Sequence, residues 1–231
     1  MEWLGYGTLG FAPGLFWLWF IVRKDRFEPE PRGLVLRVFL LGCVAPLAIL
    51  AVRPWLERLL PDEFGTRRLL LDAFVVTALF EELAKAAALS AGILFHREFD
   101  EPLDGIVYGA AAALGFASVE NVCFLVATGD PTLAVSRGFT STLVHLACTG
   151  TLGLLLARGR ISRCDRDTRI ALLGLLVVVI AHGSWDACLL ASPRAGRLGL
   201  LILTPILLAL FALLLRWAIR DSAARVAPPR T

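Results

Sequence analysis

The segment FEELAKAAAL, residues 80–89, places two glutamates and a lysine inside an apolar run. A charged side chain at the centre of a membrane helix costs about 2.5 to 3.5 kcal/mol, so Glu81, Glu82 and Lys85 need partners, protons or water. On one helix, Lys85 is within reach of Glu81 four residues earlier and of Glu82 three residues earlier. One ammonium group pairs well with only one carboxylate, which leaves the other available for acid–base chemistry. The alternative is an ion pair that only fixes helix packing.

Three other apolar segments carry polar side chains of the same kind. Residues 104–126, DGIVYGAAAALGFASVENVCFLV, contain Glu120 and Asn121. Residues 139–157, FTSTLVHLACTGTLGLLLA, contain His145, and VVVIAHGSWDACLL at 177–190 contains His182 and Asp186 four residues apart on one helix face. Each of these residues, taken alone, is compatible with a packing role or with a bond to a backbone carbonyl.

The depth of these residues in the membrane separates the two interpretations, because a shared site requires a shared layer. Counted from the expected outer ends of their helices, Glu81, Glu120, His145 and His182 lie roughly 10 to 18 Å deep, at about 1.5 Å per residue. Charges that serve separate packing contacts would not be expected to share a level. We therefore expect the four helices to bring these groups into one site.

Carboxylates beside two histidines point to hydrolysis by an activated water molecule. Neutral imidazoles and a carboxylate are the usual ligands of catalytic zinc, and a further glutamate then acts as general base. A scheme without metal is also open: glutamate and histidine activate water directly, and a second histidine with its i+4 partner stabilises the oxyanion.

Long apolar segments must position these residues. The chain of 231 residues is 57% hydrophobic, with a mean hydropathy of +0.72, which is typical of a multi-pass membrane protein. Runs of about 18 or more apolar residues, long enough to cross the bilayer, predict an all-α polytopic bundle of about seven transmembrane helices. They lie at 4–22, 34–52, 69–93, 103–127, 138–157, 168–190 and 197–217. With short loops and no evident repeat, we expect one integral-membrane domain over 1–231, with the catalytic core at about 69–190.

Basic residues orient the predicted bundle, since Lys and Arg accumulate in short cytoplasmic loops. With the N-terminus outside, the cytoplasmic loops and the tail hold about twice as many as the external loops, where Arg137 is counted. We expect this orientation, with the C-terminus in the cytoplasm, in a prokaryotic inner membrane. The net charge of +3 is what such loops produce, and nucleic acid is not an expected partner.

The order of these motifs resembles the PrsW family of intramembrane proteases. The resemblance runs from about residue 20 to about residue 190 and rests on EExxK, FxxxE, a histidine in the next helix, and HxxxD, at Glu81, Glu82 and Lys85, at Phe116 and Glu120, at His145, and at His182 and Asp186. DRFEPEP at 25–31 and DGIVYG at 104–109 also fit. The family is distantly similar to CAAX prenyl endopeptidases, but the lysine spacing, Glu120 and Asp186 depart from their motifs, so prenyl-protein processing is not expected.

The resemblance implies cleavage of a membrane-anchored substrate, such as an anti-sigma factor, on its extracytoplasmic side. It implies Glu81 as general base, with Glu82 supporting it or sharing the site, and Lys85 and Asn121 as supporting residues. For a metal ion, expected to be Zn²⁺, it implies Glu120, His145 and His182 as the leading ligands, with Asp186 as a fourth ligand or as the residue that orients a histidine. The rival interpretation is a proton- or cation-coupled transporter with a Glu/His relay, but no inverted repeat or matched pair of broken helices is visible.

Overall fold

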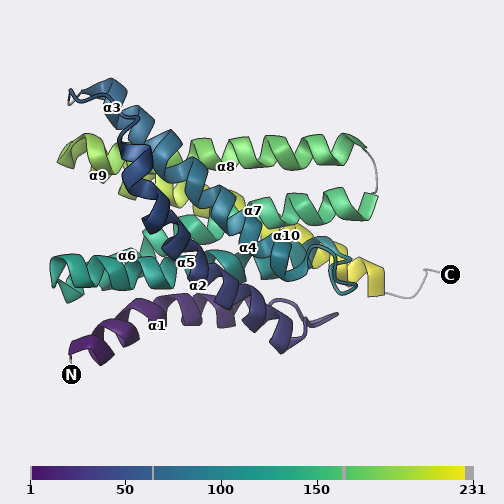
Figure 1. The fold of residues 1–231 in the computed structure, drawn as a ribbon. Helices are drawn as coiled ribbons and strands as arrows, with labels where there is room; N and C mark the ends of the chain where they lie inside the picture. The colour runs from purple at the N-terminus through teal and green to yellow at the C-terminus, as the bar shows by residue number, and fades with distance from the viewer. Residues whose placement is uncertain (1, 64, 163–164, 227–231) are drawn as a thin grey trace.

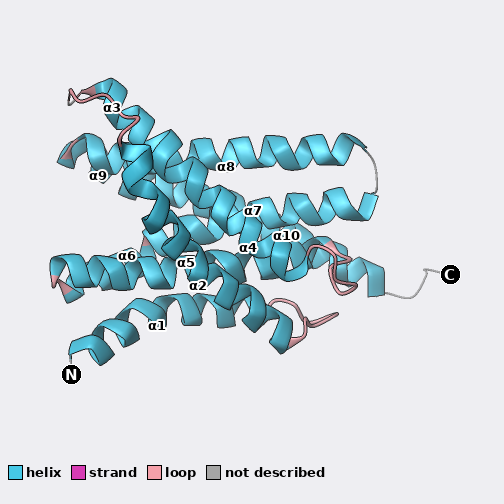
Figure 2. Cartoon of the chain, viewed as in Figure 1, coloured by secondary structure: helices cyan, strands magenta, loops and turns pink. Residues whose placement is uncertain are grey.

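The computed structural model describes residues 2–63, 65–162 and 165–226, and in these ranges the chain consists of helices joined by short loops (Figure 2). The elements are α1 (Glu2–Val22), α2 (Arg32–Glu57), α3 (Thr66–Leu71), the π-helix η1 (Asp72–Leu79), α4 (Phe80–Ile93), α5 (Pro102–Thr128), α6 (Pro131–Phe139), α7 (Ser141–Ser162), α8 (Asp165–Ala191), α9 (Pro193–Leu198), the π-helix η2 (Gly199–Leu203) and α10 (Thr204–Val226). The N-terminus lies at one end of the bundle and the end of α10 at the other (Figure 1).

Six helical stretches among the described residues are long and apolar enough to cross a membrane. They are Trp3–Val22, Arg32–Glu57, Pro102–Thr128, Pro131–Ile161, Arg169–Ala191 and Pro193–Arg225. The remaining predicted segment, 69–93, is helical but composite: α3, η1 and α4 follow one another without a loop. It differs from the others because it carries the charged triad of Glu81, Glu82 and Lys85. The all-α, polytopic fold is therefore confirmed.

Helix α5 is the centre of the bundle and is buried almost continuously from Pro102 to Ser118. Its glycines permit this burial. Gly109 lies against the backbone carbonyl of Thr149 in α7, and Gly115 against that of Phe39 in α2, so neither position has room for a Cβ atom. Small residues let helix backbones approach closely in membranes. Helices α2 and α7 are thereby held at backbone distance from α5.

The connection from α5 to α7 is a short helix, where the sequence suggested an external loop. Gly129 ends α5 with a left-handed φ of 65°, and Asp130 caps the new helix by accepting the N–H of Thr132 at 2.8 Å. Pro131 occupies the first helical position, where its missing N–H costs nothing. Arg137, in the last turn of α6, is consequently buried, and its assignment to an exposed loop was wrong.

The segments DRFEPEP and DGIVYG meet at the end of the bundle opposite the N-terminus. The hydroxyl of Tyr108 donates to Glu30, and Asp25 accepts the backbone N–H of Glu30 at 3.0 Å. Asp104 accepts the N–H of Glu101 at 2.7 Å and caps the start of α5, as expected of a polar residue there. These contacts tie the α1–α2 loop to α5.

The Glu30 carboxyl makes the stability of this junction depend on pH. Burial, with hydrogen bonding and charge from Asp104, raises the pKa of Glu30 from 4.5 to about 9. The folded protein then holds a proton that the unfolded chain releases above its ordinary pKa, so the stabilisation is complete below about 4.5 and is lost as the pH rises towards 9. We expect the melting temperature in detergent to fall from pH 5 to pH 9, and the fall to be smaller in Glu30→Gln. An equal fall in wild type, Glu30→Gln and the control Glu57→Gln would contradict this.

Candidate active site

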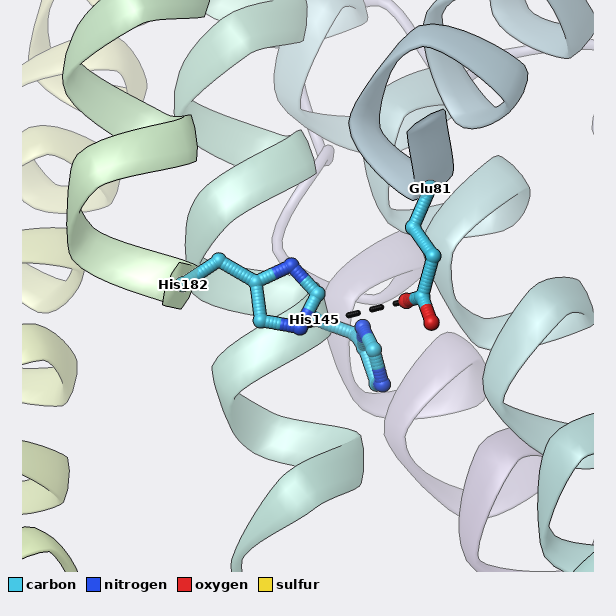
Figure 3. Close-up of side chains that lie close together, drawn as sticks. All are labelled: Glu81, His145 and His182. Atoms are coloured by element: carbon cyan, nitrogen blue, oxygen red, sulfur yellow. Dashed lines mark ion pairs between the residues drawn. The ribbon is translucent and has the colours of Figure 1, made fainter. Parts of the chain in front are cut away.

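Four helices supply the residues singled out in the sequence: α4 carries Glu81, Glu82 and Lys85, α5 carries Glu120, α7 carries His145, and α8 carries His182 and Asp186. Their side chains meet in one buried cluster. Figure 3 shows Glu81, His145 and His182 converging from three of these helices. The convergence that the residue counts predicted is therefore present.

The Lys85 ammonium is the hub of the cluster and is fully buried. Its Nζ lies 2.8 Å from Glu82 Oε1, 2.8 Å from His145 Nδ1 and 3.3 Å from Glu81 Oε2. It also sits 4.3 Å from the centre of the Phe116 ring. The closer carboxylate is Glu82, which agrees with the expectation that one lysine serves one glutamate best. Glu81 is left with the longer and weaker contact.

Glu82 is enclosed by protein and has a partner for each of its carboxylate oxygens. Oε1 contacts Lys85 and lies 2.9 Å from His182 Nδ1, and Oε2 accepts the Thr149 hydroxyl at 2.9 Å. A carboxylate that accepts one ring N–H of a histidine fixes its tautomer and orientation. Donation from Nδ1–H to Glu82 would leave the lone pair of a neutral His182 on Nε2.

The Nε2 atom of His182 faces two further carboxylates. Asp186 Oδ2 lies 3.4 Å away and Glu81 Oε2 lies 3.9 Å away. Asp186 Oδ2 is itself buried without a hydrogen-bond partner. A buried acceptor without a donor is rare in a folded protein and needs an explanation. A cation held between these groups would provide one.

Glu120 lies on the other side of His145. Its Oε2 is 2.9 Å from His145 Nε2 and accepts from Arg137 Nη2 at 2.7 Å. Both ring nitrogens of His145 therefore have partners, Lys85 at Nδ1 and Glu120 at Nε2. Asn121 accepts from Arg137 Nε at 2.9 Å and donates to the Thr142 hydroxyl at 3.0 Å.

A cavity of about 550 Å³ opens onto one side of the cluster. Over the described part of the chain, its lining includes Glu81, Glu120, His145, His182 and Asp186, but not Glu82 or Lys85. The rest of the lining is mostly apolar and comes largely from α2, α5, α6 and α8: Pro46, Ile49, Leu50, Phe116, Phe124, Leu133, Trp185, Leu189 and Leu190. Of the two adjacent glutamates, Glu81 is therefore the one that a bound molecule can reach.

Three of the described side chains have the spacing needed to hold a metal ion. One ligand atom each from Glu81, His145 and His182 lies within 4.8 Å of the others, and all three residues are buried. Two imidazoles and a carboxylate are the donor set of many catalytic zinc sites. The tautomer of His182 and the unpartnered oxygen of Asp186 also suit a cation, so the residues fit a zinc ion. His145 would have to give up one of its present contacts.

Sequence analysis did not assign two residues to the site that the structure places in the cluster, Thr149 and Arg137. Thr149 follows His145 by four residues and so lies on the same face of α7, which is a usable signal. The sequence gives no comparable signal for Arg137, because a basic residue in an expected external loop is expected to contact water.

The chain matches the model of the PrsW family intramembrane metalloproteases over residues 30–214. It is 33% identical to Protease PrsW of Bacillus subtilis over 188 residues, which is 80% of this chain and 82% of the relative. It is 32% identical to Protease PrsW of Geobacillus kaustophilus over 211 residues, 91% of this chain and 87% of the relative. The relative from Clostridioides difficile, also a Protease PrsW, is 28% identical over 198 residues.

No solved structure shows significant similarity to the chain. The family match runs from the start of α2 into α10 and contains the whole polar cluster. It extends beyond residue 190, where the motif resemblance ended. The chain belongs to the PrsW family and is a multi-pass, membrane-embedded protease.

Proposed function

We propose that this protease cleaves a single-pass, membrane-anchored protein of the anti-sigma-factor type near its extracytoplasmic end, with Glu81 as the general base and Zn²⁺ as the metal. The observation that carries this proposal is the position of Glu81: it faces the cavity between His145 and His182, whereas Glu82 is sealed behind Lys85. Only Glu81 of this pair can take a proton from water in the cavity.

The metal would be held by His145 and His182, with carboxylate support from Asp186 and Glu120, which adjoin one histidine each. Glu81 is also at ligand distance from this pair. Bound zinc supplies Lewis acidity, which polarises a carbonyl group and makes water a better nucleophile. The remaining functions fall to side chains of this chain.

The ammonium of Lys85 offsets the cost of burying the carboxylate of Glu82, its closer partner, in a low-dielectric surrounding. Glu82 holds His182 in one tautomer, and Glu120 holds His145. Glu81, which has the weaker contact with Lys85, accepts the proton of the attacking water and returns it to the leaving amine. In this scheme Lys85 neutralises buried negative charge, and Glu81 transfers the proton.

The location of the cavity supports cleavage near one membrane surface. Its lining includes Arg53, near the end of α2, and Asp72, which directly follows α3. Helix α3 lies at the same end of the bundle as the start of α1 (Figure 1). With the N-terminus outside, as the basic loops predict, this end is extracytoplasmic and the membrane is the prokaryotic inner membrane. The apolar walls suit an extended stretch of a transmembrane segment.

A reconstitution experiment tests the proposed substrate class. The purified protein is placed in liposomes with anti-sigma-factor-type single-pass proteins that carry different epitope tags on either side of the membrane segment. We expect wild type to release a fragment cut on the extracytoplasmic side, and removal of zinc with a chelator to stop the release. Cleavage on the cytoplasmic side, or no cleavage of any such protein, would contradict the proposal.

A further inference from the structure

Arg137 is a buried cation that the catalytic scheme above leaves without a role. It lies in the last turn of α6, is 9% exposed, and contributes to the lining of the cavity. An arginine in the outer half of an apolar bundle is costly unless it is paired, and such residues in membrane proteins are usually functional. The last turn of the short helix α6 places this side chain against the cluster, in contact with Glu120.

The guanidinium of Arg137 makes directed contacts with three residues. Nη2 donates to Glu120 Oε2 at 2.7 Å and to the Ser141 hydroxyl at 3.1 Å, and Nε donates to Asn121 Oδ1 at 2.9 Å. The planar group also lies over the Phe124 ring, 3.8 Å from its centre. A planar fork held from several sides has one orientation, unlike a lysine ammonium. Arg137 therefore joins α5, α6 and the start of α7 rigidly.

One carboxylate oxygen of Glu120 connects the Arg137 guanidinium to His145. Glu120 Oε2 is shared between Arg137 Nη2 and His145 Nε2, so the position that Arg137 imposes on Glu120 is passed to the histidine ring. Without the guanidinium, Glu120 would lose its 2.7 Å charge-assisted contact with Arg137 and would be held less firmly in the cavity. The orientation of the His145 ring would then depend mainly on its Nδ1 contact with Lys85.

We propose that Arg137 is a positioning residue of the protease: it fixes Glu120 against His145 and so holds that histidine ready to bind the metal. This inference rests on the proposed role of His145. Arg137 itself does not touch the scissile bond in this scheme. Loss of partners behind a metal ligand typically costs about 10- to 100-fold in metal affinity or activity.

The test measures Arg137→Gln and Arg137→Lys in liposomes with a cleaved single-pass reporter. We expect kcat to fall about 10- to 100-fold in Arg137→Gln with little change in KM, and zinc affinity, measured by chelator competition, to fall about 10-fold. Arg137→Lys keeps the charge but cannot contact Glu120, Asn121 and Ser141 together, so it should recover only part of the loss. Because Arg137 acts through Glu120, the double variant Arg137→Gln/Glu120→Gln should be no worse than Glu120→Gln.

Arg160→Gln is the matched control, since Arg160 in α7 also makes a long-range hydrogen bond, to the Phe99 carbonyl in the loop between α4 and α5, but outside the cavity lining. It should lower the melting temperature without changing kcat or zinc affinity. Three results would overturn the inference: wild-type kcat and zinc affinity in Arg137→Gln, a raised KM at unchanged kcat, or additive losses in the double variant. An inactive wild type would contradict the proposed function instead, and zinc affinity would still decide the role of Arg137.

Discussion

Glu81→Gln is expected to remove proteolysis while leaving the fold and the bound zinc in place. Glutamine is the same size as glutamate but cannot accept a proton, so the loss in kcat should be at least about 10²- to 10⁴-fold, the usual contribution of a general base. The substitution also relieves Lys85 of its second and weaker carboxylate contact, so the charge balance with Glu82 is preserved. The measurement is the initial rate of reporter cleavage in liposomes, together with zinc content and melting temperature.

Zinc content separates the two positions that Glu81 could hold, because Glu81 lies within ligand distance of both histidines. Retained zinc with lost cleavage identifies Glu81 as the base. Zinc lost together with activity would make it a ligand, and wild-type cleavage would refute both roles. Glu57→Gln is the control: Glu57 lies in an exposed ion pair with Arg53, and we expect its replacement to leave zinc content and kcat unchanged.

His182→Ala is expected to cost the protein both its zinc and its activity. The substitution removes a proposed ligand atom, Nε2, and also leaves Glu82 without its histidine partner. The drop in zinc affinity should exceed the roughly 10- to 100-fold that loss of an outer partner causes. His145→Ala should behave in the same way. Zinc content by elemental analysis and reporter cleavage on the same samples provide the measurement.

His96→Ala is the matched control for the histidine variants. His96 lies after α4, contacts the backbone of Glu98, and does not line the cavity described here. It should retain zinc and activity. If wild type cleaves the reporter at full rate with no bound zinc, the metal role falls, and water activation by glutamate and histidine alone takes its place.

Local patterns in the sequence predicted much of the site because the relevant spacings lie within single helices. Glu81, Glu82 and Lys85 meet at i+3 and i+4, as do His182 and Asp186, whatever the bundle does. The apolar lengths predicted the spans, and residue counts along them placed His145 and Glu120 at the same depth.

The residues that sequence analysis missed or left unassigned depend on contacts between helices. A pattern of basic residues places Arg137 in water, but the cap at Asp130 and the turn at Thr140 direct α6 back over the cavity. Glu81 and Glu82 are equivalent by type and neighbour each other, so no spacing tells which one faces the cavity. No spacing in the sequence connects DRFEPEP with DGIVYG; the structure connects them through the hydrogen bond from Tyr108 to Glu30.

The sequence by itself determined the class of the protein, its long apolar helices and the polar pairs within each helix, because these follow from helix periodicity and the thickness of the bilayer. Only the tertiary structure decided which carboxylate is exposed to the cavity, which nitrogen of His182 is free, and that Arg137 belongs to the site. These properties depend on how α4 to α8 rotate about their axes and pack, and packing is set by side chains far apart in the chain.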